Sequence, residues 1–212
     1  MLSLCRIFAL HGATDEFTKS EITPMYTFDY LVFIGRFQPF HLAHMQTIEI
    51  ALQQSQKLIL ALGSAQSERN IKNPFLAVER ERMILSNFSE QDQQRIEFVH
   101  VIDVYNDTKW VQLLKDLVNQ VVFPHAKVGL IGHFKDDSSY YLRLFPEWQM
   151  VELDSLKDSI SATPLREAYY RGDIQTEFFP QGTVQFLDEF QQTQTYQQLQ
   201  QKFNTADHSN LD

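Results

Sequence analysis

YLVFIGRFQPFHLAH, at residues 30–44, is the stretch of this chain that decides the fold. An apolar run ends at Gly35, a turn follows, and His41 and His44 stand at the start of an amphipathic segment. This order predicts a buried strand, a tight glycine turn and a helix with both imidazoles on one face. A helix start offers unpaired N–H groups and a positive dipole end, and Arg36 adds forked donors beside it. The stretch therefore indicates a phosphate site built without a Walker lysine loop.

Strand-like and helix-like segments alternate along the rest of the chain. Apolar runs recur at 30–35, 58–63, 96–101, 127–132 and 148–153, and helix-like stretches at 42–55, 77–88, 109–122, 138–145 and 162–171. This alternation predicts an α/β fold with a Rossmann-like, doubly wound parallel sheet. Ligands of such sheets bind at the carboxyl ends of the strands, where Gly35, Gly63, Asp103 and Gly132 fall.

Composition narrows the class of protein. The 212 residues carry a net charge of −9, which argues against general binding to nucleic acid or to an anionic membrane, so an anionic substrate needs a local basic pocket. Cys5 is the single cysteine and no apolar run is long enough to span a membrane, which favours a cytoplasmic protein. We expect an N-terminal extension at 1–25 (or a natural start at Met25), a catalytic domain at 26–190, and a glutamine-rich tail or linker at 191–212, part of which packs if Tyr196, Leu199 and Phe203 form a helical stripe.

A second phosphate-binding segment is predicted at 159–166, SISATPLR. Hydroxyls before a helix-favouring run make an N-cap, and Pro164 suits a first helical turn. Arg166 would then project beside the free N–H groups of that turn. The alternative is a plain capped helix with a solvated arginine. Together with the helix start at His41, the segment would form a phosphate clamp, and these two helix starts are its two jaws.

Two loops offer further contacts. Lys72 lies in the loop that follows Gly63 and would reach phosphate, or it is simply a solvated surface lysine. The run ERER at 79–82 is interpreted as a salt-bridged helix face. Gly132 leaves backbone room for a base or ribose, and His133 or Lys135 beyond it are further phosphate candidates.

Trp110 begins a helix after a loop that holds Asp103, Asn106 and Asp107. Its ring either belongs partly to the core or stacks on a flat heterocycle, for which a positively charged pyridinium is especially suitable. No zinc-ligand pattern accompanies the two histidines, so no protein metal site is expected, and no Gly-x-Ser-x-Gly elbow is present.

The chain resembles the archaeal-like nicotinamide mononucleotide adenylyltransferases, which belong to the HxGH nucleotidyltransferase superfamily. The resemblance lies in six segments that occur in this order: GRFQPFHLAH, GSAQ, KNPF, ER, the Trp110 loop and ISATPLR. The stretch IGHFKDDSSYYLRLFPEW at 131–148 is similar to the adenylyltransferase half of bacterial bifunctional enzymes that carry a Nudix hydrolase domain. The resemblance covers about Tyr26 to Phe190, and Ala43 stands where the superfamily usually has glycine. The Nudix signature appears nowhere in this chain, so no pyrophosphohydrolase activity is expected.

The resemblance implies transfer of the adenylyl group of ATP to nicotinamide mononucleotide with Mg²⁺, giving NAD and pyrophosphate. It implies catalytic roles for His44, His41, Arg36 and Arg166. It places ATP on Gly35, Phe37, Gly132, Ser161 and Thr163, and the mononucleotide on Trp110, Asn106 and Lys72.

Two other functions compete with this one. One is a nucleotidyltransferase of the same architecture with another acceptor, and the other is a non-catalytic module that senses a nucleotide. Both phosphate jaws are present, which favours an enzyme, and Trp110 with the KNPF loop favours a pyridine nucleotide. The expected partners are ATP and nicotinamide mononucleotide, with no nucleic acid and no membrane, and the sequence is compatible with a homo-oligomer.

Overall fold

The computed structural model describes residues 26–134, 137–154 and 161–208. The predicted extension at 1–25, Lys135 and Ser159 lie outside these residues.

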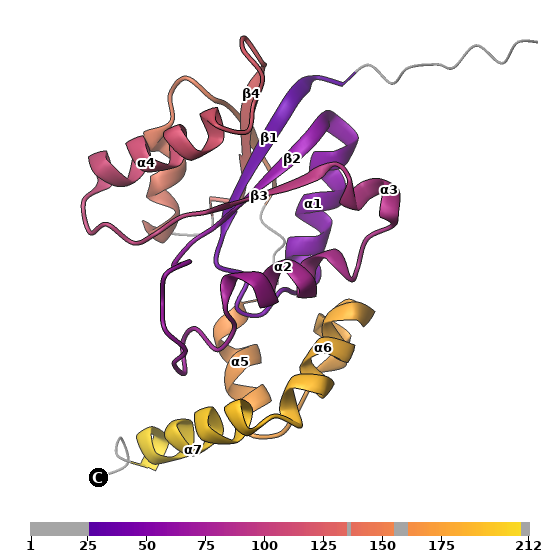
Figure 1. The fold of residues 1–212 in the computed structure, drawn as a ribbon, viewed down its shortest axis with the longest axis vertical. Helices are drawn as coiled ribbons and strands as arrows, with labels where there is room; N and C mark the ends of the chain where they lie inside the picture. Colours follow the sequence, from indigo (N-terminus) through magenta and orange to yellow (C-terminus); the bar gives the residue numbers. More distant parts are fainter. Residues whose placement is uncertain (1–25, 135–136, 155–160, 209–212) are drawn as a thin grey trace, which may run out of the picture.

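Five parallel strands form one sheet in the order β3–β2–β1–β4–β5 (Figure 1). The strands are β1 Phe28–Gly35, β2 Ser55–Leu62, β3 Ile96–His100, β4 Val128–Gly132 and β5 Gln149–Glu152. From β1 the chain winds outward to β3, and it then returns to place β4 on the other side of β1. The order in which strands are added to the sheet thus reverses between β1 and β4, which is the topological switch point of a doubly wound fold. The predicted fold class is confirmed.

The central strands are buried on both faces, as a parallel sheet covered by helices requires. In β1, Leu31 and Val32 are both completely buried although their side chains point to opposite faces. The near-continuous apolar run of this strand follows from that burial.

Helices cover both faces of the sheet. They are α1 Leu42–Gln54, α2 Ala77–Leu85, α3 Glu90–Gln93, α4 Asp107–Asn119, η1 Asp137–Leu144, α5 Ala162–Tyr170, η2 Thr176–Phe178, α6 Gln181–Gln191 and α7 Gln194–His208. The larger core joins one sheet face to α1, α2, α5, α6 and α7, and the smaller one joins the other face to α4 and η1. The stretch expected as a helix at 138–145 is a 3₁₀-helix.

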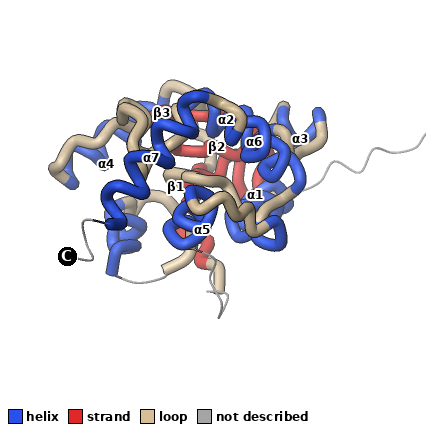
Figure 2. Tube along the Cα trace, turned by 90° about the horizontal axis from the view of Figure 1, so that it is seen from below, coloured by secondary structure: helices blue, strands red, loops and turns tan. Residues whose placement is uncertain are grey.

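The C-terminal helices pack on one another. Tyr196, Leu199 and Phe203 of α7 are buried in the larger core, and the Tyr196 hydroxyl donates to the carbonyl of Tyr169 over 2.7 Å. Figure 1 shows α5, α6 and α7 grouped at one end of the molecule, and Figure 2 looks at that end. The segment predicted as a glutamine-rich tail is therefore helical as far as His208, and the core continues past residue 190. None of the described helices has the length and apolar character that a membrane crossing needs.

Candidate active site

A cavity of about 480 Å³ opens at the carboxyl ends of β1 and β2. It is lined at the end of β1 by Gly35 and Arg36 and just after β2 by Gly63 and Ser64. Trp110 lines it from α4. Asn106 also lines it, as do Asp103, Asp107, Tyr140 and Tyr141. Of the predicted site residues, this cavity brings together Gly35, Arg36, Asn106 and Trp110.

The turn after β1 differs from the predicted glycine turn. The residue with left-handed backbone is Phe37, with φ of 51°, not Gly35. Its ring folds back under the strand, so a Cβ on Gly35 would lie 2.8 Å from the Phe37 Cζ. Gly35 is thus needed for close packing. The Phe37 side chain is 1% exposed, which leaves its backbone as the part that a ligand could reach.

The two histidines lie at the start of α1, as predicted. His41 is buried at the N-cap position, and His44 is half-buried in the first turn. The rings stack with 3.6 Å between centroids, and the His44 ring also meets the edge of Phe37. The backbone N–H of His41 donates to Nδ1 of His44 over 3.3 Å. Aromatic packing and this hydrogen bond fix the orientation of the His44 imidazole.

Arg166 joins the two predicted jaws. It lies in α5 and is 8% exposed, not solvated. Its Nη1 donates to the carbonyl of Gln38, in the turn before α1, over 2.8 Å, and its Nε donates to the carbonyl of Ile71 over 3.1 Å. The start of α5 therefore lies against the turn that leads to His41. Burial lowers the pKa of Arg166, and the nearby charge of Arg36 lowers it further.

The start of α5 carries the predicted hydroxyls. Ser161 is the exposed N-cap residue, and its side chain makes no capping hydrogen bond. The Thr163 hydroxyl lies 3.4 Å from Nη2 of Arg166. Lys72 is exposed and follows Ile71, whose carbonyl Arg166 binds, so it belongs beside α5 and is not among the residues that line the cavity with Trp110.

Trp110 packs partly against the smaller core, as one prediction had it, and it also lines the cavity, while its stacking on a heterocycle stays a prediction. Its ring packs edge-on against Tyr141 and Phe145, with centroids 5.9 and 6.1 Å away, and it also faces the cavity. Asn106 caps α4 by accepting from the backbone N–H of Lys109. These contacts set the start of α4 at the cavity wall.

The GSAQ loop after β2 is tied to the Trp110 loop. The Ser64 hydroxyl donates to Oδ1 of Asp103 over 3.1 Å, and Gln66 binds the same residue through its side chain. Ser64 is also left-handed, with φ of 51°. Left-handed non-glycine residues cost energy and concentrate at functional sites, and here they follow β1 and β2 at the same edge.

Gly132 and His133 lie at the end of β4, outside this cavity wall. A Cβ on Gly132 would make only ordinary contacts with Leu142, so the strand does not require glycine there. His133 bridges α1 to the segment after β5: its Nε2 lies 3.3 Å from the Thr47 hydroxyl and its Nδ1 3.1 Å from the carbonyl of Leu153.

The side chain of Arg80 is buried, which the sequence did not predict. The run at 79–82 was interpreted as a salt-bridged helix face, but Arg80 is 1% exposed, and its Nη1 donates to the carbonyls of Arg36 and Gly63. Burial lowers its pKa to about 10, and the charge of Arg36 also lowers it. Arg36, Arg80 and Arg166 thus gather positive charge at one edge of an acidic protein, which is the local basic site that an anionic substrate requires.

Among the described residues, no group of three or more His, Cys, Asp and Glu side chains is arranged to hold a metal ion. Magnesium in nucleotide sites keeps several waters and binds mainly to phosphates with one or two carboxylates. The cavity presents the carboxylates of Asp103 and Asp107, so the residues fit an ion that arrives with the nucleotide.

Comparison with known proteins identifies relatives. The family described as cytidylyltransferase-like matches residues 32–168. The nicotinamide/nicotinic acid mononucleotide adenylyltransferase of Acinetobacter baylyi is 68% identical over 187 residues, which are 88% of this chain and 100% of that protein. The nicotinamide-nucleotide adenylyltransferase of Pyrococcus abyssi is 26% identical over 74% of this chain and 82% of its own length.

A solved structure agrees with these relatives. The bifunctional NMN adenylyltransferase/ADP ribose pyrophosphatase of Francisella tularensis, complexed with AMP and a manganese ion, superposes with a TM-score of 0.79 at 36% identity. The match covers 87% of this chain and 55% of that one, so this chain spans about half the length of the bifunctional protein.

Proposed function

This chain belongs to the nicotinamide mononucleotide adenylyltransferases within the cytidylyltransferase-like family, and on that premise we propose that it transfers the adenylyl group of ATP to nicotinamide mononucleotide, giving NAD and pyrophosphate. One observation of the site carries the proposal: the Arg166 guanidinium binds the carbonyl of Gln38 and so joins the starts of α1 and α5. The N-termini of α1 and α5 can then bind the same triphosphate.

The reaction needs no covalent bond between the protein and a substrate. A phosphate oxygen of the mononucleotide attacks the α-phosphorus of ATP, a new P–O bond forms, and the bond from the α-phosphorus to the bridging oxygen of pyrophosphate breaks. The protein must align two polyanions and neutralise the charge that grows on the leaving group. We assign the alignment of the phosphates to His41 and Arg36, and the neutralisation of the leaving group to His44 and Arg166.

The remaining assignments divide the nucleotides between the two sides of the site. We assign Gly35, Phe37 and Gly132 to ATP through their backbones, and Ser161 and Thr163 to its β and γ phosphates. Trp110 and Asn106 hold the nicotinamide from the cavity wall. Lys72 supports the phosphate side next to α5, a place consistent with the Arg166 contact to Ile71.

Magnesium is the proposed metal ion. When bound, it neutralises part of the charge on the pyrophosphate leaving group. Asp103 or Asp107 would hold it through water. A chelator should abolish pyrophosphate release, and added Mg²⁺ should restore it. A location in the cytoplasm, where ATP is abundant, completes the proposal.

A pyrophosphate-release assay tests the function. ATP should be offered with nicotinamide mononucleotide and with nicotinic acid mononucleotide, and, for a distinct acceptor class, CTP should replace ATP with phosphocholine as the acceptor. Release with a pyridine mononucleotide supports the proposal. Release only with another acceptor would favour a different nucleotidyltransferase, and calorimetric ATP binding without any release would favour a sensing module.

A further inference from the structure

Arg80 occupies an unusual place for a charged residue. It lies in the middle of α2, and its guanidinium reaches the carboxyl edge of the sheet. The Nη1 atom donates to the carbonyls of Arg36 and Gly63, each over 2.8 Å. These two residues follow β1 and β2 directly, and both line the cavity that holds Trp110. One guanidinium therefore ties together the two turns that form the cavity floor.

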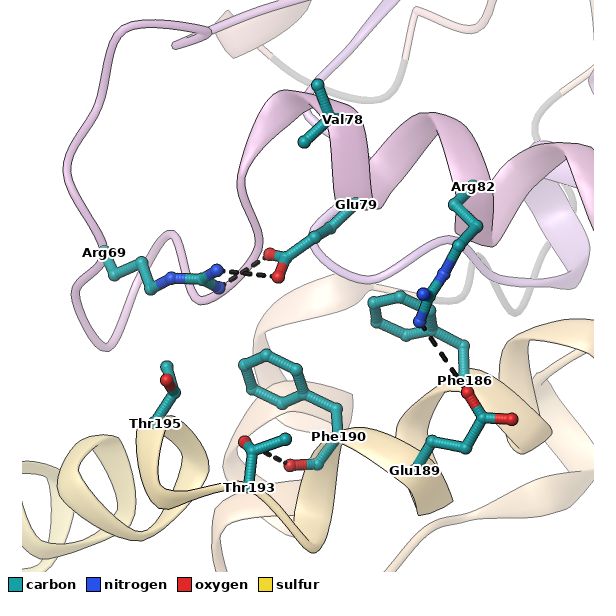
Figure 3. Close-up of a pocket in the computed structure, with 9 residues that line it drawn as sticks. All are labelled: Arg69, Val78, Glu79, Arg82, Phe186, Glu189, Phe190, Thr193 and Thr195. Carbon is teal, nitrogen blue, oxygen red and sulfur yellow. Dashed lines mark hydrogen bonds and ion pairs between the residues drawn. The ribbon is translucent and has the colours of Figure 1, made fainter.

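No carboxylate of the described residues forms an ion pair with Arg80, although the charges of Glu81 and Asp103 act on its guanidinium from nearby and raise its pKa. The acidic residues on either side of it are engaged elsewhere, since Glu79 makes a bidentate pair with Arg69 and Glu81 pairs with His100. Figure 3 shows the first of these pairs in a separate cavity between α2 and α6. Within the described parts of the chain, Arg80 forms no ion pair, and its Nε is buried without a hydrogen-bond partner.

Such a group is costly in a folded protein. Burying a charge without a counter-ion opposes folding, and an apolar residue of similar volume is often as stable or more so. Burial lowers the Arg80 pKa only to about 10, so the side chain stays charged at neutral pH. The neighbouring charge of Arg36 adds to the cost, and the charges of Glu81 and Asp103 offset part of it, but burial remains the largest effect on the Arg80 pKa. A bound polyanion would offset both charges.

We propose that Arg80 is a positioning residue for adenylyl transfer, which fixes the turns at Arg36 and Gly63 and contributes a buried positive charge that favours substrate phosphates. The inference rests on the proposed function. It separates two contributions: the charge acts on phosphate affinity, whereas the two hydrogen bonds from Nη1 set the place of Arg36 for the reaction.

Two substitutions separate these contributions. Arg80→Met removes the charge and the donors, and Arg80→Lys keeps the charge but ends short of the Nη1 position that donates to both carbonyls. For Arg80→Met we expect the KM for ATP to rise and kcat to fall, each by about tenfold or more, from the lost Coulomb attraction and the displaced Arg36. For Arg80→Lys we expect a KM for ATP within about threefold of the unsubstituted protein and a kcat that remains lowered, because the shorter side chain retains the charge but does not reach both carbonyls.

Arg82→Met is the matched control. Arg82 lies on the same helix, but it points toward Glu189 and Phe186 of α6, and its side chain is 69% exposed (Figure 3). Its substitution should leave both kinetic constants unchanged. Circular dichroism and thermal unfolding should accompany each variant, because loss of folded protein lowers the apparent kcat but leaves KM unchanged.

The outcomes are distinct. An Arg80→Met protein with normal KM for ATP would overturn the inference, whether its kcat is normal or falls only with the folded fraction. A raised KM in Arg80→Lys equal to that in Arg80→Met would overturn the role of charge. If the unsubstituted protein releases no pyrophosphate with either pyridine mononucleotide, the proposed function fails first. ATP affinity measured by calorimetry on the same three variants then still tests the charge.

Discussion

The backbone N–H of His41 donates a hydrogen bond to Nδ1 of His44, so that the first turn of α1 binds its own histidine ring. A ring nitrogen that accepts a hydrogen bond carries no proton, and the neutral imidazole of His44 therefore carries its proton on Nε2. The stacked ring of His41 and the ring of Phe37 hold the His44 imidazole in this orientation. In the proposed role of His44, the donor to a phosphate is therefore its Nε2–H.

His44 substitutions test this tautomer. His44→Ala should keep the fold and lower kcat by about 10²-fold, because one preorganised donor to the developing charge is lost. Glutamine places an amide N–H near the Nε2 position, whereas asparagine places its amide near Nδ1. His44→Gln should therefore retain more activity than His44→Asn in steady-state pyrophosphate release. Equal losses in the two variants would contradict the Nε2 assignment, and near-normal turnover of His44→Ala would remove the residue from catalysis.

Trp110→Ala should act on affinity for the mononucleotide. Stacking is similar in the ground state and the transition state, so we expect KM for nicotinamide mononucleotide to rise by about tenfold with kcat within about twofold. Trp110→Phe keeps a flat ring and the contacts with Tyr141 and Phe145, and it serves as the control for packing. A fall in kcat with unchanged KM would argue against a stacking role.

The fold could be predicted from sequence because its determinants are local and apolar. Strands buried on both faces read as continuous apolar runs, and the five predicted runs overlap the five strands. The tail was harder to assign, because glutamines surround Tyr196, Leu199 and Phe203, and only the spacing of these three reveals the buried stripe of α7.

The site was less predictable because long-range contacts decide it. The sequence placed Arg80 on a salt-bridged helix face and Arg166 in a phosphate clamp, but it did not predict the burial of either side chain, because that burial depends on carbonyls 17 to 128 residues away in sequence. The turn after β1 shows the same limit. Gly35 signals a tight place, but only the folded position of the Phe37 ring shows that packing, not a left-handed backbone, requires glycine.

Arg166→Met should lower stability as well as activity. The substitution leaves the buried carbonyl of Gln38 and the partly buried carbonyl of Ile71 without their donor, and an unpaired buried polar group costs about 1–3 kcal/mol. Denaturant unfolding should show a loss of about 2 kcal/mol or more. Arg171→Met, at the exposed end of the same helix, is the comparison. If Arg166→Met unfolds like the unsubstituted protein, its hydrogen bonds do not hold the two jaws together.

Leu199→Ala tests whether α7 belongs to the folded domain. Leu199 is 3% exposed in the larger core, and removal of a buried leucine side chain costs about 2–5 kcal/mol. We expect a single unfolding transition at clearly lower denaturant concentration. Gln198→Ala, at the neighbouring exposed position, should change stability by less than about 0.5 kcal/mol. If the two variants unfold alike, α7 is a detachable appendage; a loss confined to Leu199→Ala means that the domain is stabilised by residues well beyond position 190.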